Sequence, residues 1–554
     1  MNQPTPALVT QRAAGRLPRL ALLLFCAAYV LPGLFGRDPW RNADLTAFAT
    51  MQAIAEGRTP WLAPALGGVG VDSALLPHWL GALAIQLFGS FIDPALAARL
   101  PFGALLILTL ALVWYATFHL ARTEAAQPVA FAFGGEADPV DYARALADGA
   151  LLATIATLGL LQLGHETTPE LVQLSEVSLL MWGLAAAPHR AWAARIAMLA
   201  AIIGLAASGA PSLALALGVC AMVITARSSF AGVRQMLPWL MAATGLAALL
   251  STLTQAWHWR VDLQAHADDV FGQLRLLLWF TWPTWPLAMW TLWRWRRHWG
   301  RRHIAVPATM AAIALLASII MGGSDRALML ATPALAVLAA FALPTLQRSA
   351  SAAVDWFSVF FFSVSSLAIW IIYASMHWQV PAKPLANIQR LAPGFQPSFS
   401  LLALILAAAA TVAWMWLVRW RTSRHRHPLW KSMVLPASGV ALSWLLTMTL
   451  LLPVLDYARS PRPLVAQLTR LVPAGSCVRA PGQSRPQVAA LEVFGDYDVR
   501  LRADAQTKLD GCPWLLLQGK SLSPPATPEG WTLLGRLRRP TDRAETTSVY
   551  QQAL

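Results

Sequence analysis

The chain has 554 residues, of which 57% are hydrophobic and only 12% are charged. Soluble domains carry roughly 25% charged residues, so this composition excludes an ordinary soluble protein and indicates one that crosses a membrane several times. The net charge of +15 comes from short basic clusters between apolar runs, a distribution typical of membrane proteins, and the sequence contains no recognisable nucleic-acid-binding module.

Apolar runs long enough to cross a bilayer, about 20 residues each, follow one another along most of the chain. The first comes after Arg12, Arg16 and Arg19 and lacks a small-residue cleavage site, so we expect a retained transmembrane helix and not a signal peptide. We count about 13 such runs. They lie at roughly 19–36, 101–121, 146–164, 171–187, 195–210, 211–227, 235–254, 273–292, 304–322, 327–345, 354–375, 400–418 and 432–454.

The basic clusters predict how these spans are oriented, because arginine and lysine are enriched on the cytoplasmic side. A cytoplasmic N-terminus places the two densest clusters, at 293–303 and 419–427, in the cytoplasm as well. An odd number of spans then leaves the C-terminus on the outer face. We therefore predict a cytoplasmic segment at 1–18, a transmembrane domain at 19–455 with a long first outer loop at 37–100, and an external domain at 456–554.

The external domain is predicted from a change in sequence pattern after Ser460. One helix is expected at Pro463–Leu471, and the short runs SCVRA, AALEVFG, VRLRA, PWLLLQ and TSVYQQ, separated by turn residues, indicate strands of a small α/β domain. Cys477 and Cys512 are the only cysteines in this region, which suggests a disulfide and an oxidising compartment.

The first outer loop, Trp40 to Leu100, is too polar and too broken by glycine and proline to cross a bilayer. It contains two amphipathic runs, Asp44–Glu56 and His78–Phe88, of a kind that lies along a membrane surface. Asp44 is one of few carboxylates in the chain. The residues alone leave two interpretations open: Asp44 caps the helix that follows it, or it acts on a lipid-borne substrate.

Other ionisable residues are predicted on the same outer face. Carboxylates there are suited to act as a general base or to hold a divalent metal, with His258 or His266 as an imidazole ligand. Arg326 is of a type that binds phosphate through two hydrogen bonds. The alternatives are a solvated loop at 255–272, a helix cap at Glu170, and an Arg326 that reaches the membrane interface. Walker, GxSxG, HExxH and CxxC motifs are absent from the sequence.

The order of segments resembles a known family. A membrane helix is followed by an acidic position opening an amphipathic helix, then by PHWLGALAIQLFG and AARLP; TPELV, GLAASGAP and SDRALMLATPALAVLAA follow in matching order. The chain resembles the bacterial polyprenyl-phosphate-sugar glycosyltransferases of the GT-C fold, relatives of the protein O-mannosyltransferases and of the lipid A aminoarabinose transferase. The resemblance covers most of residues 19–455. It implies an α-helical polytopic protein of the bacterial inner membrane, with its small C-terminal α/β domain in the periplasm.

The resemblance also implies roles for individual residues. Asp44 matches the first residue of the family's acidic pair and would be catalytic, and Glu170 matches a second acidic site. Asp72 would contact a metal, for which residue chemistry alone makes His266 a further candidate ligand, and the resemblance implies that His258 or His266 lies at the lipid site. The residues expected to bind substrate are Asp72, Arg58, Arg99, His258, His266 and Arg326.

Several positions depart from the family's pattern. Leu45 replaces the second acid of the pair, Ser73-Ala74-Leu75 replaces a Lys-Pro-Pro motif, Ser208 replaces a turn lysine, and Asp325 replaces a lysine beside Arg326. Three cations that would bind a phosphate are therefore missing. Nearby arginines of the first loop are the candidates to replace them: Arg37, Arg41, Arg58 and Arg99.

The function implied is transfer of a sugar from a polyprenyl-phosphate carrier to a lipid, glycan or protein acceptor on the periplasmic face, with a divalent metal as the one cofactor considered. The alternative is a catalytically degenerate protein on the same scaffold, which binds lipid-linked sugar or assists another enzyme. Under both interpretations the chain contacts membrane lipids, and nucleic acid is not expected as a partner.

Overall fold

The computed structural model describes residues 5–40, 42–71, 74–257, 270–422, 428–505, 511–520, 525–542 and 544–552. The chain is mostly helical and falls into two compact units, each of which is described by itself. The first unit contains Met1–Pro32, Phe102–Leu367 and Ile405–Leu446, and the second contains Gly33–Pro101, Ala368–Leu404 and Thr447–Leu554.

The first unit is a bundle built around two small-residue helices, α5 (Pro139–Ala156) and α16 (Thr332–Ala342), which pack against each other. Their alanines and glycines are almost all buried, because small side chains let helix backbones approach closely. A Cβ added at Gly149 would stand 2.5 Å from the side chain of Leu343, just after α16, so that side chain would have to shift. α13 (Thr284–Arg294) packs against both helices.

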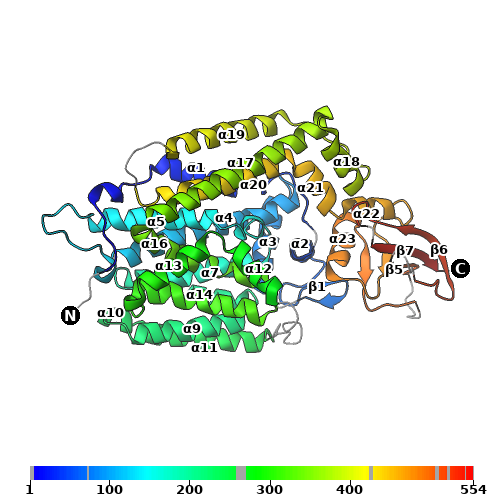
Figure 1. Ribbon diagram of the computed structural model, residues 1–554. Coiled ribbons are helices and arrows are strands. Elements are labelled where there is room, and N and C mark those ends of the chain that lie inside the picture. The colour runs from blue at the N-terminus through cyan, green and yellow to red at the C-terminus, as the bar shows by residue number, and fades with distance from the viewer. Residues whose placement is uncertain are drawn as a thin grey trace. The chain divides into compact units, whose positions relative to one another are not determined.

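A second layer of helices extends this bundle. α7 (Pro169–Ala186) pairs with α8 (Ala191–Ala207), and α9 (Pro211–Ala226), α11 (Leu237–Leu253) and α14 (Arg302–Ile320) lie side by side (Figure 1). The remaining helices assigned wholly to this unit are η1 (Gln11–Ala14), α1 (Arg19–Val30), η2 (Glu124–Ala126), α6 (Leu160–Leu163), α10 (Ala231–Arg234), α12 (Val270–Phe280), η3 (Arg296–His298), α15 (Asp325–Met329) and η4 (Leu343–Thr345).

Within the described ranges, six helical segments are long and apolar enough to cross a membrane: Pro94–Ala121, Ala231–Leu253, Arg302–Ile320, Arg348–Trp378, Leu401–Arg421 and Lys431–Leu450. Several shorter apolar helices accompany them, so the expected total of about 13 spans stays a prediction. Four long helices contribute residues to both units: α4 (Pro94–Ala121), α17 (Arg348–Trp378), α19 (Leu401–Thr422) and α20 (Lys431–Leu450).

The second unit contains a five-stranded sheet of order β4-β3-β5-β7-β6. The first three strands are parallel, and β7 runs antiparallel to both of its neighbours. The strands are β3 (Cys477–Arg479), β4 (Asp498–Arg500), β5 (Trp514–Lys520), β6 (Trp531–Leu537) and β7 (Glu545–Gln552). The helices assigned wholly to this unit are α2 (Ala43–Ala55), α3 (Leu75–Phe88), α18 (Ala382–Leu391), α21 (Leu452–Arg459), α22 (Arg462–Leu468) and α23 (Arg485–Gly495).

Two expectations for the C-terminal region are corrected. Residues 489–495, expected to be a strand, belong to α23, the crossover helix between the parallel strands β3 and β4. The helix begins with Ser484 and Gln487 in a capping box, a signal that outweighs the short alternating run. Strand β6 was not expected from the sequence, and the expected helix at Pro463–Leu471 is the shorter α22.

The first outer loop is folded onto this C-terminal sheet domain. Leu45 and Ala49 of α2 belong to the same hydrophobic core as α22, α23 and the sheet, so α2 is buried in protein and does not lie on a membrane surface. A short hairpin, β1 (Ala65–Leu66) and β2 (Val69–Gly70), turns at two glycines with positive φ. Gly67 of this turn donates its N–H to Glu492 of α23.

Helix α3 has a different surface. Leu83, Leu87 and Phe88 are exposed, while His78 and Ala82 are buried. One face of α3 is therefore buried and the other exposes apolar side chains, which agrees with the pattern expected for a helix at a membrane surface.

Cys477 of β3 is disulfide-bonded to Cys512, just before β5, and the bond closes a segment with a sequence separation of 35. We expect replacement of both cysteines by serine to destabilise the second unit by about 3–4 kcal/mol, because the crosslink restricts the unfolded chain. Thermal unfolding of the purified protein would measure this loss. Cys220→Ser, which removes a free thiol, is the control and should leave the midpoint unchanged; equal midpoints for all three proteins would contradict a stabilising crosslink.

Candidate functional site

Asp44 forms a buried ion pair with Arg37. Arg37 Nη1 lies 2.8 Å from Asp44 Oδ2, and the two side chains are 3% and 1% exposed. The same carboxylate oxygen accepts the backbone N–H of Trp40 at 3.2 Å, and Arg37 Nε donates to the carbonyl of Gly33. These bonds fix both charged groups and the loop between them.

The capping interpretation of Asp44 is replaced by this ion pair. α2 begins at Ala43, so its N-cap position is Asn42, which has a positive φ and makes no side-chain cap bond. Asp44 lies in the first helical turn, where a negative charge is favoured by the helix dipole. Its carboxylate, however, turns back to Arg37 and Trp40 instead of capping the turn.

Arg99, at the start of α4, adds a second buried guanidinium to this cluster. It is 2% exposed, donates from Nη1 to the backbone carbonyl of Arg37 at 2.8 Å, and lies within electrostatic reach of Arg37 and Asp44. Among the described residues, Arg99 Nη2 has no hydrogen-bond partner. A buried unpartnered guanidinium N–H is costly, so this group is suited to receive an oxyanion.

A second carboxylate network anchors the same loop. Asp38 accepts two hydrogen bonds from Arg462, at 2.9 and 2.7 Å, and one from the hydroxyl of Ser460. Asp456 accepts the indole N–H of Trp40 and the backbone N–H of Asp38. Asp456 was not among the expected site residues, since it lies more than 400 residues from its partners and no local motif marks it.

The two carboxyls of this network have opposite pKa shifts. Burial favours the neutral form of Asp38, but the hydrogen bonds and charge of Arg462 more than offset it and hold the pKa of Asp38 below its usual value. Burial raises the pKa of Asp456, and the neighbouring charge of Asp38 adds to the rise.

In the first unit, Arg326 lies between two carboxylates. Its Nη2 donates to Glu166, and its Nη1 lies 3.6 Å from Glu170. Burial alone would lower the pKa of Arg326, but the charges of Glu166 and Glu170 reverse this and raise it. The structure therefore brings Arg326 and Glu170 together, but the charge of Arg326 is already compensated.

Glu170 and Arg326 line a cavity of about 300 Å³. Glu170, Gln173 and Arg326 contribute polar side chains to it, and most of its other lining residues are apolar and come from the beginning of α9, the end of α14 and α15. Ser208, where the family has a lysine, is buried in the turn before α9, and its carbonyl accepts a hydrogen bond from Gln173. This turn provides no cation.

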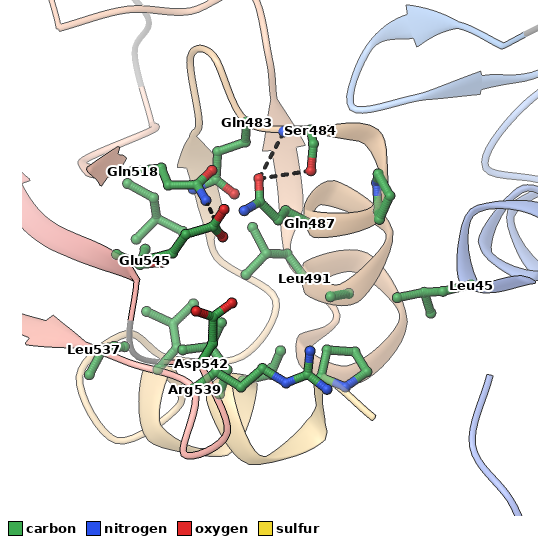
Figure 2. A pocket seen from close by; sticks show the side chains of 18 of the residues that line it. Leu45, Gln483, Ser484, Gln487, Leu491, Gln518, Leu537, Arg539, Asp542 and Glu545 are labelled. Carbon is green, nitrogen blue, oxygen red and sulfur yellow. Dashed lines mark hydrogen bonds between the residues drawn. The ribbon is translucent and has the colours of Figure 1, made fainter. Parts of the chain in front are cut away.

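A further pocket, of about 230 Å³, lies in the second unit between α2, α22, α23 and the sheet (Figure 2). Leu45, Leu491 and Leu537 contribute apolar surface to it. The ends of Gln518 on β5 and Glu545 on β7 meet in a 2.7 Å hydrogen bond. The other polar side chains of the lining include Gln483, Ser484, Gln487, Arg539 and Asp542.

This pocket was missed by sequence reasoning. Its amides and carboxylates come from separate strands and loops, and only the pairing of β5 with β7 places Gln518 near Glu545. Amide and carboxylate groups offer donors and acceptors together, which suits a hydroxyl-rich ligand on a partly apolar surface.

Other expected site residues have different positions. Arg58 pairs with Glu56 and with Glu492 of α23, so it joins the first loop to the C-terminal domain and is not grouped with Arg37 and Arg99. Asp72, His258, His266 and Arg41 lie outside the described residues. Among the residues that are described, no group of three His, Cys, Asp or Glu side chains forms a metal site. The expected metal ligation by Asp72 and His266 stays a prediction.

Comparison with solved structures identifies the fold. ArnT from Cupriavidus metallidurans bound to undecaprenyl phosphate matches with a TM-score of 0.63 and 14% sequence identity, over 96% of this chain and 97% of that one. The chain has the ArnT fold. The apo state of the same protein matches with a TM-score of 0.60 and 15% identity, over 96% and 98% of the two chains. No protein-family model and no curated sequence matches.

The ArnT fold confirms the expected fold class, a GT-C-type helical membrane protein with a small C-terminal α/β domain. At 14% identity the likeness extends to the fold alone, so any activity has to be argued from the residues of this chain.

We expect Arg37→Leu to destabilise the protein by about 3–5 kcal/mol, because it leaves the buried carboxylate of Asp44 without its charge partner. The double variant Arg37→Leu/Asp44→Leu should lose less than the sum of the two single variants. Denaturation of the purified proteins in a double-mutant cycle measures the coupling. Strictly additive losses would contradict a coupled buried pair.

Asp38 generates a pH-dependent prediction. Because its pKa is lower in the folded state, its stabilisation is complete above its ordinary pKa, about 4, and is lost as the pH falls through the lowered value. Arg462 is largely exposed, so we expect Asp38→Asn to cost only about 1 kcal/mol at pH 7. The difference in unfolding midpoint between the variant and the wild type should shrink on acidification. A difference of the same size at pH 7 and about pH 3 would contradict this assignment.

Proposed function

We propose that the protein is a membrane glycosyltransferase that moves a sugar from a polyprenyl-phosphate carrier to an acceptor on the periplasmic face of the bacterial inner membrane. The observation that carries the proposal is the buried Arg37–Asp44–Arg99 cluster in a chain with the ArnT fold. The ArnT structure that matches was solved with bound undecaprenyl phosphate, a carrier of this chemical class.

The lipid phosphate is the leaving group of this reaction, and a cation has to lie beside it to stabilise the charge that it gains. The acceptor oxygen attacks the anomeric carbon, the bond from that carbon to the phosphate oxygen breaks, and the phosphate keeps the electron pair. Its added negative charge needs a preorganised donor. We assign this role to the unpartnered Nη2 of Arg99, supported by Arg37, in place of the family's missing cations.

Asp44 is the proposed catalytic carboxylate, which takes the acceptor proton as the new glycosidic bond forms. Its ion pair with Arg37 keeps it oriented before the reaction. Asn42, the N-cap residue of α2, and Leu45, in its first turn, line the pocket shown in Figure 2, which supports that pocket as the place where part of a hydroxyl-rich acceptor binds.

A second candidate function is favoured by the compensation of Arg326. With Glu166 and Glu170 both beside it, this arginine presents no net positive charge to a phosphate. A protein that binds lipid-linked sugar without transferring it, or that assists another enzyme, needs less electrostatic stabilisation of a leaving group. The two functions differ in what Asp44 is required for.

Complementation of a deletion strain tests the proposal. We expect Asp44→Asn to reduce transfer by at least about 100-fold, since a positioned general base contributes on the order of 10²–10⁴ in rate. A polyprenyl-phosphate sugar should then accumulate in membranes of both the deletion strain and the Asp44→Asn strain, as measured by mass spectrometry of the lipid extract.

The matched control is Asp38→Asn, which removes a different ion-paired carboxylate from the same loop and should complement like the wild type. Gel filtration of each purified variant would show whether it is folded. If folded Asp44→Asn complements fully, Asp44 is structural and the transferase proposal fails. If the lipid still binds purified Asp44→Asn and the deletion causes no accumulation, the accessory function is the better one.

A further inference from the structure

A large basic cavity lies in the first unit, at the end of the helix layer where α9 ends and α14 begins. Its volume is about 740 Å³, within the range of ligand-binding pockets. Its lining contains one carboxylate, that of Glu124. Four arginines and one histidine also line it: Arg227, Arg297, Arg301, Arg302 and His298. No part of the proposed transferase mechanism uses these residues.

Among the described residues, no carboxylate pairs with three of the four arginines of this cavity. These three are Arg227, Arg297 and Arg302. Arg302 instead donates to the hydroxyl of Ser228 and to the backbone carbonyl of Leu184 on α7, while its buried Nε has no hydrogen-bond partner in the described part of the chain. The cavity therefore has an excess of positive charge.

A neighbouring histidine responds to this positive charge. His189, in the turn between α7 and α8, has a lowered pKa, caused first by burial and then by the charges of Arg122 and Arg302. A cationic environment disfavours protonation of an imidazole, so the charge of Arg302 adds to the lowering of the pKa that burial already causes.

Apolar side chains adjoin the arginines. Trp299 and Phe230, which line the cavity, are 57% and 45% exposed, and Val223 of α9, also in the lining, is exposed. Exposed aromatic rings next to arginines at helix ends are typical of the interface between a bilayer and water. The ligand that fits both features carries phosphate groups on an apolar body.

We propose that this cavity binds the phosphate headgroup of an anionic phospholipid, with Arg227, Arg297 and Arg302 contacting the phosphate oxygens and the acyl chains lying against α9. Its volume and its number of arginines favour a headgroup with two phosphates. Arginine suits this role because its planar guanidinium can donate two parallel hydrogen bonds to one phosphate. The site would hold a structural lipid and not the sugar donor.

The test uses the full-length purified protein and measures lipids retained in native mass spectrometry, with cardiolipin and phosphatidylcholine as probes. We expect the wild type to retain cardiolipin in preference to phosphatidylcholine. Arg227→Gln/Arg297→Gln should weaken cardiolipin binding by roughly 30-fold, about fivefold for each arginine near the surface. Arg296→Gln is the matched control, because Arg296 neighbours Arg297 but does not line the cavity.

Two further arms make the result decisive. Arg227→Lys/Arg297→Lys keeps both charges, so it should retain most of the binding and shows whether loss in the glutamine variant comes from charge or from misfolding. Inorganic pyrophosphate tests for a soluble ligand: if it binds as tightly as cardiolipin, the site is for free phosphate and the lipid assignment is wrong. Equal cardiolipin binding by the wild type and the glutamine variant, or an equal loss in Arg296→Gln, would overturn the proposal.

Discussion

The buried ion pair of Arg37 and Asp44 is the constraint on which the second unit depends. A charge in a protein interior is tolerated only when it is paired and hydrogen-bonded, so the position of Asp44 determines the positions of Arg37 and of the loop between them. The following turn of α2 carries Leu45 into the core of the C-terminal domain. The first loop and the C-terminal domain therefore fold as one structure, although more than 350 residues separate them in the sequence.

The same electrostatic rule separates the two arginine clusters considered for phosphate. Arg99 is buried with one donor lacking a partner among the described residues, which favours an incoming oxyanion. Arg326 lies against Glu166 and Glu170, so a phosphate would have to displace a carboxylate to reach it. The sequence makes Arg99 and Arg326 equal candidates for binding phosphate. Their neighbours in the structure leave Arg99 with a donor for an oxyanion and pair Arg326 with carboxylates.

Part of the fold was predictable because its cause is local. Long apolar segments and basic clusters predicted a polytopic membrane protein, and turn residues with alternating runs predicted strands at β5 and β7. Two predictions were wrong: the residues of α23 were expected to form a strand, and strand β6 was missed. In both places a short apolar run does not distinguish a helix from a strand or a loop. In α23 the capping box at Ser484 outweighed the alternation that had suggested a strand.

The sequence by itself determined the class of protein, the two cysteines available to the C-terminal domain, and the acidic position at the start of α2, because composition, residue count and helix-forming patterns act over a few neighbouring residues. Only the tertiary structure decided what Asp44 contacts, that Arg99 keeps a donor without a partner among the described residues, and that Gln518 and Glu545 meet in one pocket. These depend on which distant segments pack together, and a charge has no functional meaning until its neighbours are known.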